Sequence, residues 1–297
     1  MDSIPRNIFQ THKSIQYVRS NEKLRKATQS WKGHPEFNYY FYNDQDCERL
    51  IEYMETIFPG IKKQYDRLPM NVMKADVWRY CVIYVYGGIY ADVDAVLLTD
   101  PNIFINHKNI DLVIAPENSI HICQWTFSAR KNSPVLKTII QEMVNRLENT
   151  PEIFGEHIIH ELTGPCNFTR GISKYLEDSG LIVNEDDKYS HWFSIYKFLD
   201  SKDLKNLTQT DINKLSMQKF LLNKSNEGIG SGHADQRIGW VYFLLKEYGT
   251  EKLAQYNILL LDRYMFHTKI IRHLFSGSWS DGWTHERREK LMNPKTI

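Results

Sequence analysis

Asp92 and Asp94 are two carboxylates, two residues apart, inside the otherwise apolar stretch 74–98. An Asp-x-Asp pair suits a divalent metal that carries the phosphates of a substrate, because Mg²⁺ and Mn²⁺ prefer hard oxygen ligands and leave positions for phosphate and water. Carboxylates at a buried strand end also need a cation or hydrogen-bond donors. A solvated turn is the alternative for the bare tripeptide, which is common by chance. The elements around the pair favour the metal site.

Two apolar elements are predicted to position this pair. One face of a helix is indicated by apolar residues at steps of three and four, namely Ala75, Trp78, Val82 and Val85. Gly87 and Gly88 then end the helix, because glycine accepts the backbone angles of a helix end. From residue 89 to residue 97, apolar residues alternate with Tyr90, Asp92 and Asp94, which is the period of a strand. The carboxylates are therefore expected on one face of a strand or at its end.

Asp76 and Arg79 lie three residues apart, so they share one face of the first turns of the predicted helix. An ordinary ion pair, worth a few tenths of a kcal/mol, is the simplest interpretation of this spacing. The alternative is that Asp76 and Arg79 have a functional role. This interpretation depends on the rest of the sequence block in which they lie.

The same block of sequence resembles the signature of glycosyltransferase family 32. The matching residues are Lys74-Ala75-Asp76, Trp78-Arg79-Tyr80 and the segment 86–94, YGGIYADVD. That family includes the fungal initiating α-1,6-mannosyltransferase, animal α-1,4-galactosyl- and N-acetylglucosaminyltransferases and bacterial capsule enzymes, and the catalytic core of the clostridial glucosylating toxins is similar. The resemblance implies a GT-A fold, an α/β, Rossmann-like nucleotide-diphospho-sugar transferase fold with a mixed central sheet and additional helices.

The resemblance also implies roles for the residues of the block. Asp94 would bind the metal directly, and Asp92 would bridge the metal, water and the ribose or sugar of the donor. Asp76 and Arg79 would orient the donor sugar, and these four residues form the implied catalytic set. Lys74 and Tyr90 would join the donor-binding residues, Lys74 as a weaker member.

A second landmark near the C-terminal end of the sequence looks like the closing segment of the family, His-x-x-x-Gly-Ser-Trp, with His273 as its histidine. Imidazole is a good Mn²⁺ ligand, and a histidine with one or two aspartates completes a partly hydrated octahedron. The resemblance implies that His273 is the ligand opposite Asp94, with His267 in reserve. Ser278 and Trp279 would hold the diphosphate.

Two further segments are assigned by the same resemblance. Gln10 and Thr11, at the end of a predicted strand, would contact the base or ribose, and a plain strand end is the alternative. Thr163-Gly164-Pro165 would shape the wall of the acceptor pocket, and a simple turn is the alternative, because Gly-Pro breaks regular structure by itself.

The order of the predicted elements also favours an α/β fold, because strands and helices alternate along the first half of the chain. We expect strands at 4–12, 37–42, 111–115, 120–129 and 257–261, the last strand, and helices at 21–31, 61–68 and from Ser133-Pro134 onward. Asp44 and Asn71 are candidate helix caps. The whole chain, 1–297, is predicted to be one domain, with a donor-binding half at 1–130 and an acceptor-side half at 131–297.

The composition of the 297 residues is that of an ordinary globular protein. Lys and Arg number 37 against 36 Asp and Glu, which gives no support to a nucleic-acid partner. The four cysteines have no metal-ligand spacing. The sequence has no signal peptide and no apolar run of about 18–20 residues, so no transmembrane segment is expected. A bacterial, viral or host cytosolic setting is therefore predicted, unless a membrane anchor has been removed.

The resemblance implies that the protein is a retaining, metal-dependent glycosyltransferase. It would move a hexose from a nucleotide-diphosphate sugar to a glycan or other hydroxyl acceptor. A UDP-hexose or UDP-N-acetylhexosamine donor is favoured over GDP-mannose, and Mn²⁺ over Mg²⁺. Three alternatives stay open: a sugar- or metal-binding module without turnover, a sugar-nucleotide hydrolase, and a toxin-like enzyme that glycosylates a protein. The sequence does not specify the sugar, the base, the acceptor, the linkage or the oligomeric state.

Overall fold

A computed structural model of the chain describes residues 3–117, 121–153, 158–180 and 253–275. Within these ranges, six strands form a central sheet in the order β2-β1-β3-β6-β5-β7, and two more form a small antiparallel sheet, β4-β8. The strands are β1 (Asn7–Thr11), β2 (Asn38–Tyr42), β3 (Gly88–Ala91), β4 (Ala95–Leu97), β5 (Leu112–Ile114), β6 (Thr126–Ala129), β7 (Ile258–Leu260) and β8 (Ile271–His273). The central sheet is mixed, because β6 runs antiparallel to both of its neighbours while the other pairs are parallel.

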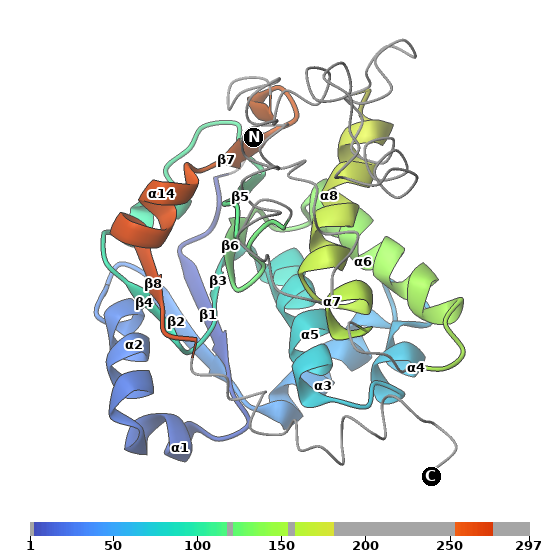
Figure 1. The fold of residues 1–297 in the computed structure, drawn as a ribbon, viewed down its shortest axis with the longest axis horizontal. Coiled ribbons are helices and arrows are strands. Elements are labelled where there is room, and N and C mark those ends of the chain that lie inside the picture. Colours follow the sequence, from blue (N-terminus) through green and yellow to red (C-terminus); the bar gives the residue numbers. More distant parts are fainter. Residues whose placement is uncertain (1–2, 118–120, 154–157, 181–252, 276–297) are drawn as a thin grey trace, which may run out of the picture.

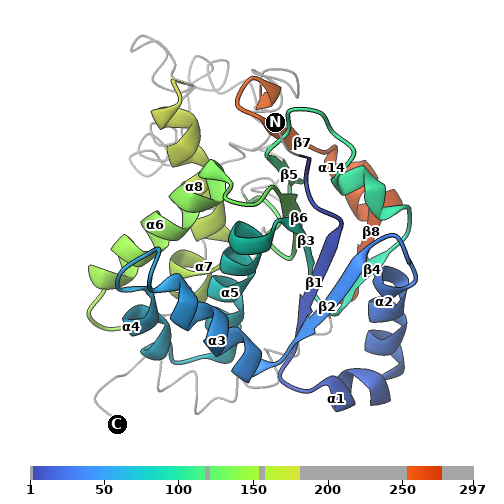
Figure 2. The same cartoon turned by 180° about the vertical axis from the view of Figure 1, so that it is seen from behind.

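Helices cover both faces of this sheet (Figure 1 and, from behind, Figure 2). One face carries α3 (Asp44–Met54), α4 (Ile61–Asp66), α5 (Asn71–Tyr86), α6 (Pro134–Glu148), α7 (Ile158–Leu162) and α8 (Pro165–Asp178). The other face carries α1 (Ile15–Ser20), α2 (Glu22–Lys32), the 3₁₀ turn η1 (Pro101–Phe104), α14 (Arg263–Met265), the π-helical turn η5 (Phe266–Ile270) and the β4-β8 pair. The predicted α/β class, with the mixed central sheet of a GT-A fold and additional helices, is confirmed.

The central strands β1 and β3 contribute side chains to both faces of the sheet, because successive side chains of a strand point to opposite faces. In β1, Ile8 packs with the α2 side of the molecule and Phe9 with the α5 side. In β3, Ile89 and Tyr90 divide in the same way. Each face therefore has its own apolar core, and the sheet separates the two.

Helix α5 is the most deeply buried helix next to the site. The sequence predicts one buried face, but every residue from Asp76 to Tyr84 is buried, so the helix is enclosed on all sides. It ends at Gly87, whose φ of 66° is a conformation that glycine adopts without strain. Gly88 follows with a φ of 127°, and a Cβ atom there would lie 2.5 Å from the carbonyl oxygen of Asn7. Glycine at this position lets β3 lie directly against β1.

Several local predictions are wrong. Asn43, rather than Asp44, caps α3 through a capping box with Asp46, and Asn71 is the first residue of α5 rather than its cap. The alternating run 89–97 is not one strand: it divides into β3 and β4, which belong to different sheets. Strand β7 is not the last strand, because β8 follows it.

Other predicted elements are confirmed, among them β1, β2, α2, α4, β5 and α6 with Ser133 as its N-cap. In the described residues, no helix combines the length and apolar character needed to cross a bilayer. The predicted single domain with its two halves, and the cytoplasmic setting, stay predictions.

Candidate active site

The two aspartates lie in the turn between β3 and β4, where the chain leaves the central sheet and enters the small one. Hydrogen bonds from two other segments fix the backbone of this turn. The amide of Asp92 donates to the carbonyl of Trp125 at 2.8 Å, and the amide of Leu274 donates to the carbonyl of Asp94 at 3.0 Å. Asp94 is only 8% exposed. The turn is therefore packed into the protein. It differs from the solvated turn that was the alternative interpretation of the Asp-x-Asp pair.

His273 reaches this turn because β8 pairs antiparallel with β4, with His273 opposite Ala95. Its Nε2 atom lies 3.2 Å from Oδ1 of Asp94. Asp92, Asp94 and His273 each offer one ligand atom, and these atoms all lie within 4.8 Å of one another. Two carboxylate oxygens and one imidazole nitrogen are a donor set that fits Mn²⁺. The structure thus brings together the three predicted metal ligands, although Asp94 and His273 lie 179 positions apart in the sequence.

The electrostatics of this group also suit a cation. Burial raises the pKa of Asp92, opposed by Arg79 and reinforced by the negative charge of Asp94. For His273, burial lowers the pKa, but the hydrogen bond and charge of Asp94 outweigh burial and raise it. A buried and a partly buried carboxylate in one turn repel each other, so a bound divalent cation would offset both the desolvation and the repulsion.

Arg79 joins the helix to the acidic turn. Its Nη2 atom lies 3.1 Å from Oδ1 of Asp76 and 3.4 Å from Oδ1 of Asp92. Its guanidinium also lies 4.8 Å from the centre of the Tyr90 ring, and the hydroxyl of Tyr90 donates a hydrogen bond to Asp92. The ordinary i,i+3 ion pair therefore exists, but it is buried and it extends to a proposed metal ligand.

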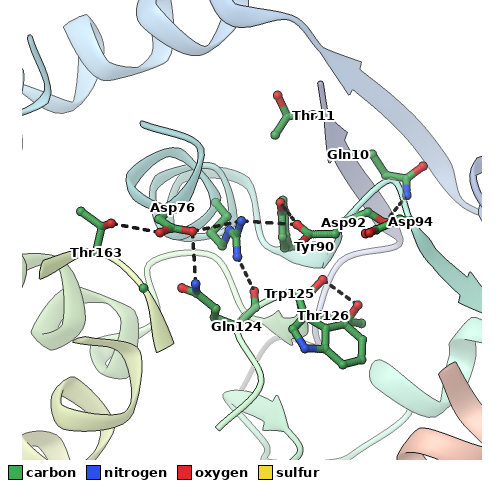
Figure 3. A network of polar contacts seen from close by, with 12 residues as sticks. Gln10, Thr11, Asp76, Tyr90, Asp92, Asp94, Gln124, Trp125, Thr126 and Thr163 are labelled. Carbon is green, nitrogen blue, oxygen red and sulfur yellow. Dashed lines mark hydrogen bonds and ion pairs between the residues drawn. The ribbon is translucent and has the colours of Figure 1, made fainter. Parts of the chain in front are cut away.

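Asp76 is held on its other side by residues far away in the sequence. Thr163 Oγ1 donates to its Oδ2 at 2.9 Å, and Gln124 Nε2 donates to its Oδ1 at 3.1 Å (Figure 3). Burial raises the pKa of Asp76 to about 6, against the opposing charge of Arg79 and these hydrogen bonds. The sequence analysis missed Gln124 and assigned Thr163 to the wall of an acceptor pocket or to a simple turn, because no local pattern links either residue to Asp76.

Gln10 lies beside the turn, and both ends of its side chain are engaged within the protein. Its Nε2 donates to the carbonyl of Asp92 at 3.1 Å, and its Oε1 accepts from the Tyr39 hydroxyl at 2.7 Å. Thr11 and Lys74 line a common cavity beside α3, and Thr11 also donates to the carbonyl of Tyr42 at 3.0 Å. Gln10 thus supports the acidic turn. The contacts of Gln10, Thr11, Lys74 and Tyr90 with a donor stay predictions.

The remaining predicted site residues divide into two groups. Ser278 and Trp279 lie outside the described residues, so their predicted contacts with a diphosphate stay predictions. His267, the reserve ligand, lies with its Nε2 2.9 Å from the carbonyl of Pro116 and its ring beside Trp125. It is not in the group of potential metal ligands found among the described residues.

One further carboxylate, Glu117, was missed by the sequence analysis. It follows β5 in the chain, and its charge interacts with His273, Asp92 and Arg79. A glutamate at the end of a short apolar strand has no distinctive spacing, so no sequence signal singles it out.

Comparisons with known proteins agree with this geometry. Residues 9–111, which include Asp76, Arg79 and the two aspartates of the turn, match the family described as "Glycosyltransferase sugar-binding region containing DXD motif". This part of the chain is therefore similar to the DXD-containing glycosyltransferases, and the resemblance expected from the sequence is confirmed.

Individual relatives point in the same direction. The chain is 26% identical over 206 residues to the initiation-specific alpha-1,6-mannosyltransferase of Candida albicans, covering 59% of this chain and 54% of the relative. Its counterpart in Schizosaccharomyces pombe is 27% identical over 198 residues, covering 58% and 49%. Inositol phosphoceramide mannosyltransferase 3 of the same yeast is 38% identical over 96 residues, covering 31% and 24%. The chain thus spans about half the length of each of the first two relatives.

Among solved structures, the PaToxG glycosyltransferase is similar to this chain with a TM-score of 0.46 and 16% sequence identity, covering 73% of this chain and 86% of that one.

Proposed function

We propose that this protein is a metal-dependent glycosyltransferase that moves a hexose from a nucleotide-diphosphate sugar to a hydroxyl of a glycan or other acceptor. The observation that carries the proposal is the meeting of buried Asp94 with the partly buried Asp92 and His273 in one group, linked through Arg79 to Asp76. The family match of residues 9–111 supports a sugar transferase over a metal-binding module or a hydrolase.

The donor follows from two considerations. The resemblance of the sequence favours a UDP-hexose or UDP-N-acetylhexosamine, with GDP-mannose as the alternative. The similar yeast proteins are named mannosyltransferases, which supports mannose as the sugar transferred here. We therefore keep both donor classes in the proposal and distinguish them by experiment.

The residues of the site divide the work between them. When bound, Mn²⁺ or Mg²⁺ would supply Lewis-acid stabilisation of the charge on the departing diphosphate. Asp92, Asp94 and His273 would hold the ion, and Mn²⁺ is preferred because nitrogen ligands suit Mg²⁺ less well. Arg79 fixes the carboxylate of Asp92 and, with Asp76, would orient the donor sugar.

Retention of the anomeric configuration is part of the proposal and is carried over from the resemblance. The acceptor oxygen would attack on the same face as the leaving group, and a diphosphate oxygen would take the acceptor's proton. We name no protein nucleophile. Analysis of the product anomer by NMR tests this point, because an inverted product excludes the retaining mechanism.

The first experiment measures donor binding and hydrolysis with Asp94→Ala beside the wild type. The panel contains UDP-glucose, UDP-galactose, UDP-N-acetylglucosamine and GDP-mannose, each with Mn²⁺ and with EDTA. We expect binding of one donor that needs Mn²⁺ and is lost in Asp94→Ala, because a buried ligand to the ion has been removed. Asp66→Ala, on the exposed side of α4, is the control and should behave as the wild type.

The outcomes separate the alternatives. Absence of nucleotide-sugar binding in the wild type, with Mn²⁺ and with EDTA, would overturn the transferase proposal. Binding without either transfer or hydrolysis would favour a binding module. Hydrolysis that stays much faster than transfer across a range of acceptors would favour a sugar-nucleotide hydrolase.

A further inference from the structure

Glu117 lies at the start of the connection from β5 to β6, and its backbone is firmly held. Arg263 Nε donates to its carbonyl at 3.2 Å, and its own amide donates to the carbonyl of His121 at 2.9 Å. The preceding carbonyl, that of Pro116, lies 2.9 Å from Nε2 of His267. Neighbours on α14 and η5 therefore fix the backbone of this segment.

The side chain, in contrast, is incompletely satisfied. Oε2 of Glu117 is buried and has no hydrogen-bond partner among the described residues. Burial raises the pKa of Glu117 to about 7, opposed mainly by His273. A buried carboxyl oxygen without a partner costs free energy, and structural needs alone do not account for such a group. The residue before Glu117, Pro116, contacts His267, whose ring lies 5.8 Å from that of Trp125, and the Trp125 ring lies 4.6 Å from that of His273. Contacts between neighbouring side chains therefore connect the segment that carries Glu117 to the candidate metal group.

A second buried polar group, the indole N–H of Trp125 beside His273, also has no hydrogen-bond partner among the described residues. The two groups are complementary in kind, because Glu117 offers an acceptor and Trp125 offers a donor. A sugar hydroxyl both donates and accepts hydrogen bonds, so a polyhydroxylated ligand satisfies groups of both kinds.

We propose that Glu117 is a substrate-binding residue whose carboxyl oxygen accepts a hydrogen bond from a sugar hydroxyl at the reaction centre. The inference rests on the proposed function, because it takes the ligand to be a sugar. The hydroxyl belongs either to the donor sugar or to the acceptor, and the chemistry of recognition is the same in both cases. Glu117 binds no metal in this proposal.

The test uses Glu117→Leu, which has a similar volume and no polar atoms to satisfy. Without ligands, we expect the variant to have a higher melting temperature than the wild type, because an unsatisfied buried oxygen is removed. A glutamate with a structural role would give the opposite result. Affinities for Mn²⁺ and for the free nucleoside diphosphates UDP and GDP should stay within about twofold of wild type. Glu52→Leu, on the exposed side of α3, controls for the substitution itself.

Two measurements then identify the hydroxyl. If it belongs to the donor, the affinity for the nucleotide sugar relative to the free diphosphate falls by about tenfold or more, because a hydrogen bond to a charged group is lost. If it belongs to the acceptor, that ratio is unchanged, and transfer to methyl α-D-mannopyranoside falls about tenfold relative to donor hydrolysis. Both results support the inference.

Two results would overturn it. The first is that both ratios stay at the wild-type value while the wild type itself binds and turns over donor. The second is a loss of Mn²⁺ affinity in Glu117→Leu, which would make the residue part of the metal site. Failure of the proposed function is a different result, since the wild type would then bind no nucleotide sugar.

Discussion

At the scale of single residues, the guanidinium of Arg79 contacts two carboxylates that come from different elements. Asp76 belongs to α5 and Asp92 to the acidic turn, so their relative position depends on one side chain. A planar guanidinium can contact two oxygens in fixed directions, which a lysine ammonium cannot do in the same way. The position of Asp92 is therefore coupled to whatever holds Asp76.

Thr163 is one of the groups that hold Asp76, and Thr163→Val tests its contribution. Burial raises the pKa of Asp76 from 3.8 to about 6, so ionised Asp76 contributes an unfavourable free energy that grows as the pH rises through this range. The Thr163 hydroxyl offsets part of this cost, because it donates to the carboxylate at 2.9 Å. We expect the variant to lose about 1–2 kcal/mol of unfolding free energy at pH 8 and less at pH 5.

Urea unfolding at the two pH values measures this difference. Thr163→Ser keeps the hydroxyl and should retain most of the stability at pH 8. Equal losses at both pH values in Thr163→Val would mean that the threonine matters through packing, and the assigned hydrogen bond would then have no electrostatic role.

At the scale of elements, the close approach of β1 and β3 sets the position of the acidic turn. Gly88 makes this approach possible, since a Cβ atom would lie 2.5 Å from the Asn7 carbonyl oxygen. We expect Gly88→Ala to lower the unfolding free energy by about 2 kcal/mol or more, because backbone strain and a steric clash combine. It should also weaken Mn²⁺ binding, because the turn that follows β3 would shift.

Gly180→Ala is the matched control for this prediction. Gly180 also has a positive φ, of 84°, but a Cβ atom there would meet no atom of the described residues within 4 Å. It should therefore cost only the conformational strain and leave Mn²⁺ binding unchanged. If both variants lose the same stability, the contact between β1 and β3 is not the reason for glycine at position 88. Denaturant unfolding and a Mn²⁺ titration provide the two readouts.

The same elements explain which parts of the structure the sequence could predict. The end of α5 at Gly87 and the start of α6 at Ser133 depend on local backbone chemistry, and both were predicted. The division of residues 89–97 between two sheets was not, because period-two alternation is the same for one long strand and for two short ones. Strand β8 is three residues long, IRH, and carries no recognisable period.

The candidate site shows the same division. Asp92 and Asp94 were found from their spacing, and Asp76, Arg79 and His273 from the family resemblance. Gln124 and Thr163 contact Asp76 across sequence separations of 48 and 87 residues, and no local pattern encodes such contacts. Glu117 was missed for another reason. It is distinguished by a buried carboxyl oxygen that has no hydrogen-bond partner among the described residues, and a sequence pattern does not show this.

At the scale of the whole molecule, the metal group joins segments from distant parts of the chain. Asp92 and Asp94 follow the central sheet, and His273 comes from β8 through its pairing with β4. A ligand that binds only the folded state stabilises it, by about 2.7 kcal/mol when its concentration is 100 times the dissociation constant. An ion bound by all three residues should therefore stabilise the pairing of β4 with β8.

We expect Mn²⁺ to raise the melting temperature of the wild type by several degrees and to have little effect on His273→Ala. Differential scanning calorimetry with Mn²⁺ and with EDTA measures both proteins. His34→Ala, in the loop after α2, serves as the control and should keep the full response. A response in His273→Ala as large as that of the wild type would exclude His273 as a ligand.

If the proposed site binds a metal ion, the origin of His273 in β8 determines when during synthesis the complete set of ligands becomes available. A ribosome releases the chain from its N-terminal end, so both aspartates emerge long before the histidine does. Until residue 273 has left the exit tunnel, β4 lacks its partner strand, and the nascent chain carries two carboxylates without the imidazole. Stable loading of the ion is therefore delayed until β8 has been made, and a chain cut short before that strand would retain most of the central sheet but an incomplete set of ligands.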